Sequence, residues 1–275
     1  MHLMRNGLFL LKSTRVLLPG NRYRKLRRHA DPNYVHDRDK HPLRNKHHGA
    51  EGWQSREVDG LTYRDYGDYD QYVTHQRQKL LEILKAHGGF STKVVLRQRY
   101  DFWRRFQSLT LPKDARIMCL GARLGTEVEV LRDLGYTRAI GTDLEPGPDN
   151  PYVEIGDFMN IDAETSSVDM IYCNAVDHAF DLERFFKEHA RVLKPNGLAM
   201  YDISTGPPGS FEAVHWGDER DLIALMLTHF KQLERVGIDG DWKTICLRGK
   251  RDAFQVAAAG TDEARSETTG AAHDA

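Results

Sequence analysis

The chain has 275 residues, of which 40% are hydrophobic and 29% charged, and its formal net charge is −1 at pH 7. This composition indicates a soluble globular protein with room for one full α/β domain and additions, or for two small domains. The three cysteines (Cys119, Cys173 and Cys246) stand far apart in apolar runs, which argues against a disulfide framework or a metal site, and no apolar run reaches the ~18–20 residues needed to span a bilayer. We therefore expect a cytoplasmic protein without a bound metal.

The first 50 residues are strongly basic. They hold twelve Lys and Arg residues against three Asp, a net charge of +9, and six of the 13 histidines. Three interpretations are open: an extension that packs locally or stays disordered, an arm that contacts an anionic membrane or nucleic-acid surface, and an organellar transit peptide. Residues 31–60 are polar and rich in turn-forming residues, so residues 1–60 as a whole are interpreted as a basic, His-rich extension and linker.

Residues 61–110 are predicted to form a helical segment ahead of the main domain. Apolar residues recur at three- and four-residue steps over 63–86, and Gly88-Gly89 ends this helix. A second helix over 93–108 carries an apolar stripe suited to packing on a sheet. The stripe consists of Val94, Leu96, Tyr100, Trp103 and Phe106.

From residue 115 onward, predicted strands and helices alternate, which favours a mainly parallel sheet with helices on both faces. Near the end, a segment containing Asp239-Gly240 separates two apolar strands, the pattern of a tight antiparallel hairpin. Residues 252–275 have the composition of a disordered tail. The expected strands are 116–120, 138–142, 151–155, 168–173, 198–203, 231–237 and 242–249, and the expected helices are 126–134, 181–193 and 219–230.

A glycine turn follows the first of these strands. Gly121 and Gly125 lie between the strand and the helix that begins at residue 126, and the next strand is followed by Asp143. Strand, glycine turn, helix, strand and acid is the layout of a nucleotide-binding α/β unit, in which the helix N-terminus and the carboxylate face the ligand.

With the segments that follow, this layout resembles the class I S-adenosylmethionine (SAM) dependent methyltransferases. The resemblance lies within residues 115–204, in ARIMCLGARLGTEVEVL, AIGTDLEP, YVEIGDF, VDMIYCNAVDHAF and ARVLKPNGLAMYDIS. It implies a Rossmann-like α/β fold whose mainly parallel, seven-stranded sheet ends in a C-terminal antiparallel hairpin. It also implies SAM as the cofactor, a SAM-binding domain over residues 111–251, and N-terminal helices that form a lid over the cofactor pocket. The alternative for these helices is simple packing on the sheet, and the two roles are compatible.

The resemblance assigns cofactor contacts to individual residues. The turn glycines allow a close backbone approach, since a side chain there would block the ligand. Asp143, followed by Leu144, matches the acid that accepts the ribose hydroxyls. Asp157 matches the acid that takes the adenine amino group, and Phe158 is expected against the adenine ring.

The first motif departs from the common family pattern. Cys119 stands where an acid is common, and Arg123 replaces the central glycine, a Gly-Ala-Arg-x-Gly form that resembles a subgroup of methyltransferase type 11-like domains. We predict that Arg123 pairs with the SAM carboxylate and Glu127 with the SAM ammonium. The alternative is that Arg123 points outward and Glu127 only caps its helix.

Three polar residues follow the strand at 168–173. Asn174, Asp177 and His178 are placed at the carboxyl edge of the sheet, where ligands bind in open α/β folds, and so near the sulfonium methyl. Asp177 or His178 is the candidate base for an acceptor hydroxyl, because the pKa of histidine suits proton transfer near neutrality. Alternatively, these residues only shape the pocket, since in-line methyl transfer needs mainly positioning.

The leading hypothesis is SAM-dependent methyl transfer to an oxygen of a small molecule or glycan. The chain lacks the Asn-Pro-Pro-Tyr and Asp-Pro-Pro-Tyr motifs of base-amine methylation, and Phe211, His215 and Trp216 are expected on the acceptor side. The alternatives are an RNA-associated methyltransferase guided by the basic segment, a non-catalytic methyltransferase-fold scaffold, and an NAD-type oxidoreductase, whose G-x-G-x-x-G spacing is missing.

Overall fold

The computed structural model describes residues 55–87, 92–146, 151–204, 209, 211–239 and 242–251. The predicted basic extension before residue 55 and the predicted tail after residue 251 lie outside the described residues. Within the described part, no helix is both long and apolar enough to cross a membrane.

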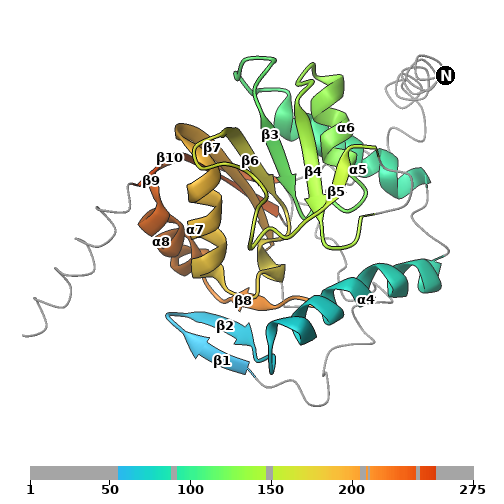
Figure 1. Cartoon of the computed structure of the whole chain (residues 1–275), viewed down its shortest axis with the longest axis vertical. Coiled ribbons are helices and arrows are strands. Elements are labelled where there is room, and N and C mark those ends of the chain that lie inside the picture. Colours follow the sequence, from blue (N-terminus) through green and yellow to red (C-terminus); the bar gives the residue numbers. More distant parts are fainter. Residues whose placement is uncertain are drawn as a thin grey trace, which may run out of the picture.

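A seven-stranded sheet forms the centre of the fold (Figure 1), with the strand order β5-β4-β3-β6-β7-β10-β9. The five strands from β5 to β7 pair in parallel, whereas β10 runs antiparallel to both β7 and β9. This confirms the predicted mainly parallel sheet with a C-terminal antiparallel hairpin. The strands are β3 (Ile117–Leu120), β4 (Ala139–Asp143), β5 (Val153–Ile155), β6 (Val168–Cys173), β7 (Leu193–Ser204), β9 (Phe230–Asp239) and β10 (Trp242–Lys250).

Helices cover both faces of the sheet, and each face has its own apolar core. Along β3, Ile117 and Cys119 pack in the core under α5 and α6, while Met118 and Leu120 pack in the core under α7 and α8. All four side chains are buried, which is why the strand reads as an unbroken apolar run rather than an alternating one. The helices are α5 (Thr92–Phe106), α6 (Thr126–Asp133), α7 (Leu182–Val192) and α8 (Glu219–His229).

Helix α7 passes into β7 without a loop. The sequence predicts a helix over 181–193 and the next strand over 198–203, but β7 already begins at Leu193, which pairs with Val168 across a register shift in β6. The physical reason is burial: Leu193 is fully buried in the core under α7 and α8, so the chain enters the sheet immediately.

Helix α5 is fixed to the sheet by its aromatic and basic side chains. Phe102 and Phe106 pack edge-to-face on Tyr172 of β6, and Arg105 pairs with the buried Asp202 of β7 at 2.5 Å. The predicted stripe is only partly correct, since Phe106 is buried but Val94, Tyr100 and Trp103 are exposed.

A second, three-stranded sheet lies beside α4 (Figure 1) and has the order β1-β2-β8. Its first hairpin turns at Asp59 and Gly60, which adopt φ angles of 51° and 76°, as a two-residue hairpin loop requires. The sequence analysis placed residues up to 60 in a linker and began a helix at 63, so it missed this sheet. The elements are β1 (Ser55–Val58), β2 (Leu61–Arg64), β8 (Val214–Trp216) and α4 (Tyr69–His87).

Candidate functional site

The glycine turn after β3 is held tightly between two neighbouring segments. Gly121, Arg123 and Gly125 all have positive φ angles, of 72°, 37° and 65°. The backbone N–H groups of Gly121 and Ala122 donate to the Thr142 carbonyl at the end of β4, at 2.9 and 3.0 Å. A Cβ added at Gly121 would lie 2.9 Å from the Ala175 Cβ, so the turn has no room for a side chain there.

Asp143 ties the end of β4 to this turn. One carboxylate oxygen accepts a hydrogen bond from the Arg123 backbone N–H at 3.0 Å, and the other accepts one from Glu145 N–H at 2.9 Å. Burial raises the pKa of Asp143, while the Arg123 guanidinium opposes the shift. Each oxygen keeps a second lone pair with which it could accept a ligand hydroxyl. Leu144, next along the chain, is half-buried.

Arg123 and Glu127 are buried, oppositely charged neighbours at the turn, and the hydrogen-bonding capacity of Arg123 is not fully used. Glu127, in the first turn of α6, is only 4% exposed, and burial raises the pKa of its carboxyl to about 8. Arg123 has a buried Nε atom with no hydrogen-bond partner among the described residues, and burial lowers the pKa of its guanidinium. A buried carboxyl and an unsatisfied guanidinium nitrogen fit a ligand that carries both an ammonium and a carboxylate.

Asp157 and Phe158 follow β5. One Asp157 oxygen accepts a hydrogen bond from the Tyr69 hydroxyl of α4 at 2.5 Å, and the other accepts one from Met159 N–H at 2.7 Å. Phe158 is 5% exposed, and its ring packs edge-to-face on Phe185 of α7. The Asp157 carboxylate therefore lies under α4, whereas most of the Phe158 ring is committed to the core.

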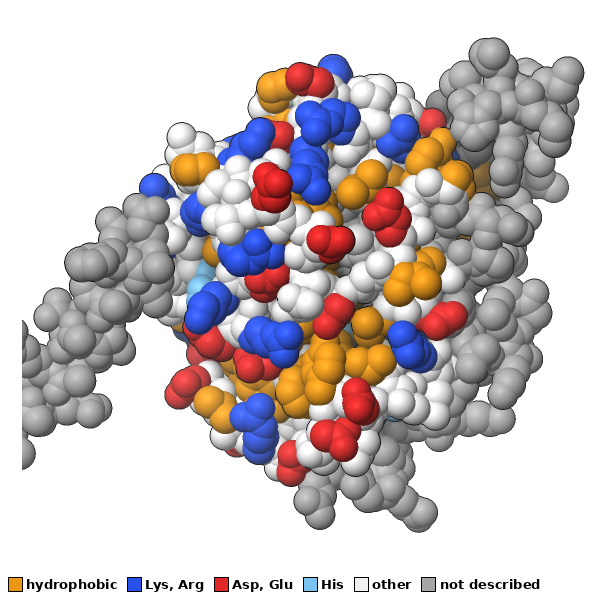
Figure 2. All heavy atoms as spheres, viewed as in Figure 1, with side chains coloured by type: hydrophobic (Ala, Val, Ile, Leu, Met, Phe, Trp, Pro, Cys, Tyr) orange, Lys and Arg blue, Asp and Glu red, His pale blue; other side chains and the backbone are white. Residues whose placement is uncertain are grey.

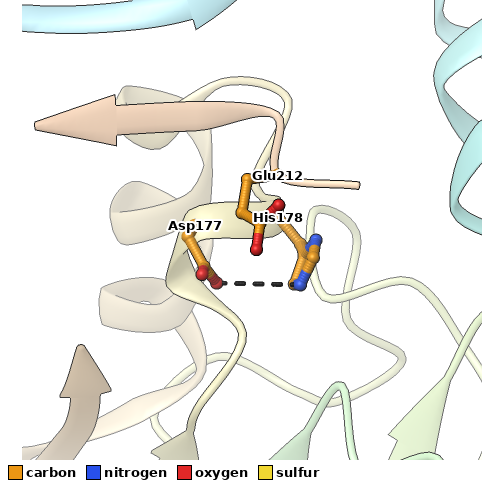
Figure 3. A group of neighbouring side chains, drawn as sticks. All are labelled: Asp177, His178 and Glu212. Carbon is orange, nitrogen blue, oxygen red and sulfur yellow. Dashed lines mark ion pairs between the residues drawn. The ribbon is translucent and has the colours of Figure 1, made fainter. Parts of the chain in front are cut away.

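A polar cluster lies just beyond β6. Asn174 follows the strand directly, and the short helix η2 (Val176–His178) carries Asp177 and His178. Figure 3 shows that these two side chains converge with Glu212, which precedes β8; one ligand-capable atom from each lies within 4.8 Å of the others.

The hydrogen bonds of His178 define its tautomer. Nδ1 lies 2.9 Å from the Phe211 carbonyl oxygen, which can only accept, so Nδ1 carries the proton. Nε2 lies 2.5 Å from the Lys79 Nζ of α4 and accepts a hydrogen bond from it, and Asp177 Oδ1 is 3.8 Å away. Burial and the Lys79 charge lower the pKa of His178 well below its usual value. The imidazole is therefore neutral, with its Nε2 lone pair directed at Lys79.

Lys79 is a functional candidate that the sequence analysis missed. Burial lowers the pKa of its ammonium to about 8, the nearby Arg123 charge adds to the shift, and Asp177 and Glu212 oppose it. Carboxylate and imidazole groups can also bind a divalent cation, but the Nε2 atom of His178 is already bonded to Lys79. The sequence predicts the helix that carries Lys79, but neither Lys79 nor Glu212 lies in a sequence motif that would indicate a site residue.

The sheet defines the class of fold. A mainly parallel seven-stranded sheet closed by a C-terminal antiparallel hairpin, with a glycine turn after β3 and an acid at the end of β4, is the Rossmann-like fold of class I methyltransferases. Residues 118–201 match the family model described as a methyltransferase domain, so the chain is a SAM-dependent methyltransferase with SAM as its cofactor.

Solved structures agree on the fold. The Burkholderia thailandensis 1,6-didemethyltoxoflavin-N1-methyltransferase, with bound 1,6-didemethyltoxoflavin and S-adenosylhomocysteine, is 12% identical, and the match covers 72% of this chain and 100% of that chain with a TM-score of 0.52. A complex between the Haloferax volcanii Trm112 methyltransferase activator and a candidate methyltransferase is 15% identical over 64% of this chain and 98% of that chain, with a TM-score of 0.53. No curated protein sequence matches the chain.

Proposed function

We propose that the chain transfers the methyl group of SAM to an oxygen of a small molecule or glycan and that His178 takes up the acceptor proton. The observation that carries this proposal is the fixed tautomer of His178. Its Nδ1 proton is held by the Phe211 carbonyl, so its Nε2 carries the lone pair at the carboxyl edge of the sheet, where it accepts a hydrogen bond from Lys79. A neutral imidazole in this position can act as a base.

The residues around the glycine turn are the proposed cofactor contacts. Gly121 and Gly125 allow the backbone approach, Asp143 with Leu144 meets the ribose, and Asn174 lies on the same edge. SAM, when bound, supplies an electrophilic methyl group on a sulfonium.

The remaining contacts serve the two ends of the cofactor. Arg123 and Glu127 are assigned to its carboxylate and ammonium, which their buried and incompletely paired state supports. Asp157 is assigned to the adenine amino group, with the exposed margin of Phe158 against the ring. The Tyr69 hydroxyl of α4 donates to the same carboxylate, and each Asp157 oxygen keeps a second lone pair for the adenine amino group. This contact of α4 with an assigned cofactor ligand supports a lid role for α4.

Two negative charges support the base role of His178. Asp177 lies 3.8 Å from Nε2, and Glu212 lies in the same cluster. Carboxylates near an imidazole favour its protonated form, so both would stabilise the imidazolium once the proton has been transferred. Before that step, the hydrogen bond between Lys79 and Nε2 has to break. Because Lys79 lies on α4, a shift of this helix would break it.

The test combines binding and turnover. Isothermal titration calorimetry with SAM, and with NADH as the control for an oxidoreductase, measures cofactor choice. Formation of S-adenosylhomocysteine over a panel of hydroxyl and amine compounds then finds the acceptor. We expect His178→Gln to bind SAM like the wild type and to lose turnover by about 10²–10⁴-fold. Wild-type turnover in this variant would exclude His178 as the base, and SAM binding without turnover on any acceptor would favour the scaffold.

We further propose that the protein acts in the cytoplasm and that residues 1–50 contact an anionic membrane or nucleic acid. An RNA acceptor is the second candidate, favoured by the net charge of +9 on that segment. Methyl incorporation into RNA that disappears with residues 1–50 would favour it over a small-molecule or glycan acceptor.

A further inference from the structure

Lys79 occupies the place where an acceptor nucleophile would be expected. Its Nζ is 2.5 Å from His178 Nε2, the lone pair assigned above to the acceptor proton. Its charge interacts with Asp177 and Glu212 of the polar cluster and with Arg123 and Asp143 at the glycine turn. Lys79 is therefore close to both the polar cluster after β6 and the turn that is assigned to the cofactor.

Three other lysines of the described part have partners of a different kind. Lys194 pairs with Asp169 at 2.6 Å, and Lys243 pairs with Glu219. Lys113 donates to the Leu134 carbonyl in an exposed position. Lys79 differs from these three in that its hydrogen-bond partner is a neutral imidazole nitrogen, which can accept its proton.

We propose that Lys79 is a self-methylation site, a primary amine on α4 that the enzyme methylates when SAM is bound and no external acceptor fills the site. This inference rests on the proposed function, because it uses the same cofactor site and the same base.

The chemistry balances without any further reactant. The Lys79 ammonium gives one proton to His178 Nε2, which leaves a lone pair on Nζ. Nζ forms a bond to the methyl carbon of SAM, the carbon–sulfur bond breaks, and its electron pair stays on sulfur, giving S-adenosylhomocysteine and an N-methylated lysine. His178 then releases its proton to solvent. A lysine pKa of about 8 raises the fraction of Lys79 that carries a free lone pair near neutral pH, since an ordinary lysine has a pKa of about 10.4.

The direct test is peptide mapping by mass spectrometry after incubation of the full-length wild type with methyl-labelled SAM. We expect one labelled lysine, Lys79, and no label at that position in Lys79→Arg, which keeps the charge but lacks a nucleophilic amine. The matched control Lys194→Arg should label like the wild type. His178→Gln should label at least tenfold more slowly while its SAM affinity is unchanged. Label spread over many lysines would overturn the proposal, because it would indicate uncatalysed methylation.

A second readout needs no turnover. Competitive labelling of the protein with an amine-reactive reagent, across a pH series, measures the reactivity of each lysine. We expect Lys79 to react at lower pH than Lys113 or Lys194, and S-adenosylhomocysteine to change the reactivity of Lys79 alone among these three. If SAM binds by calorimetry but Lys79 is neither labelled nor affected by S-adenosylhomocysteine, this inference fails and the proposed function stands. If SAM does not bind at all, the proposed function fails as well.

Discussion

Asp143 has two roles that can be separated by experiment. Its carboxylate fastens the glycine turn through the Arg123 N–H, and the same oxygens are the proposed ribose ligands. We predict that Asp143→Asn weakens SAM binding by more than tenfold, since hydrogen bonds to a charged group contribute about 1.5–3 kcal/mol. Calorimetry measures the affinity and thermal unfolding the stability. The exposed Asp162→Asn is the control. Unchanged SAM affinity in a folded Asp143→Asn protein would remove the assignment.

Glu127 offers a test through proton release. Its pKa of about 8 means that the carboxyl is mostly protonated at pH 7 in the absence of a ligand. If the SAM ammonium pairs with it, binding lowers this pKa and releases close to one proton. Calorimetry in buffers of different ionisation enthalpy measures that number. We expect release on SAM binding to the wild type, and much less with Glu127→Gln or with adenosine, which lacks the amino-acid end. Equal proton release in all three cases would show that Glu127 does not pair with the SAM ammonium.

The same carboxyl also affects stability as a function of pH. Because its folded pKa of about 8 lies above the ordinary value of 4.5, the folded state binds more protons than the unfolded state between these two pH values. The free energy of unfolding should therefore fall as pH rises through this window, by up to ~1.4 kcal/mol per pH unit from this group. Glu127→Gln removes the effect. Urea unfolding of both proteins from pH 5 to pH 8 should show the variant gaining relative stability with rising pH; parallel curves would contradict the assignment.

At the scale of the elements, α4 and α5 have different tasks although they are adjacent in sequence. Helix α5 is bound to the sheet through Phe102, Phe106 and Arg105, whereas α4 reaches the site through Tyr69 and Lys79. We therefore propose α4, rather than α5, as the lid.

The buried pair between Arg105 and Asp202 provides the prediction for α5. Asp202 is 2% exposed and also accepts hydrogen bonds from the hydroxyls of Tyr172 and Thr244. We predict that Arg105→Met lowers the free energy of unfolding by about 3 kcal/mol, because it leaves a buried carboxylate without its counter-charge. Chemical denaturation measures the loss. Arg104→Met, one residue earlier on the same helix, is the control and should cost less than 1 kcal/mol. Equal losses in both variants would show that the pair does not anchor α5.

The elements of the main sheet could be predicted because their signals are local. The first central strand, β3, is a continuous apolar run, and α7 and α8 begin at the capping residues Asp181 and Asp218. The second sheet could not be predicted whole, since β2 pairs with β8 from far along the chain. Only the hairpin between β1 and β2 has a local sequence signal, the turn-forming pair Asp59-Gly60.

The site divides in the same way. Gly121, Asp143 and Asp157 follow strands in recognisable motifs, so their positions could be deduced from the sequence. Lys79 and Glu212 could not, because their role depends on which residues of a helix and a loop come to lie over the sheet edge. That placement is a property of the tertiary fold.

On the scale of the whole molecule, charge is segregated along the chain. On the face in Figure 2, acidic and basic side chains of the described residues are interspersed, whereas residues 1–50 alone carry a net charge of +9. We predict that a protein starting at Trp53 unfolds cooperatively and binds SAM like the full chain. Calorimetry and thermal unfolding test this. Loss of cooperative unfolding would show that the segment is part of the core.

The same truncation tests the anionic-surface hypothesis. If the segment is an electrostatic arm, the full chain should bind single-stranded RNA or anionic vesicles with an affinity that falls steeply between 50 and 200 mM salt, roughly as the number of neutralised charges predicts. The truncated protein should lose this binding. Equal binding by both proteins would assign the contact to the folded domain. Stronger binding to RNA than to vesicles would identify nucleic acid, rather than a membrane, as the partner.

The small sheet has a consequence for how such an enzyme could diversify. Glu212 and Phe211 precede β8, which pairs with β2 rather than with the main sheet, and Ala213 is hydrogen-bonded to Asp177 at 2.7 Å. The wall next to the proposed base, His178, is therefore built from a late loop and an early hairpin, while the glycine turn and Asp143 lie at the ends of β3 and β4. Insertions between β7 and β8 could reshape the acceptor pocket and leave the cofactor contacts intact, so new acceptors could be acquired without rebuilding the donor site.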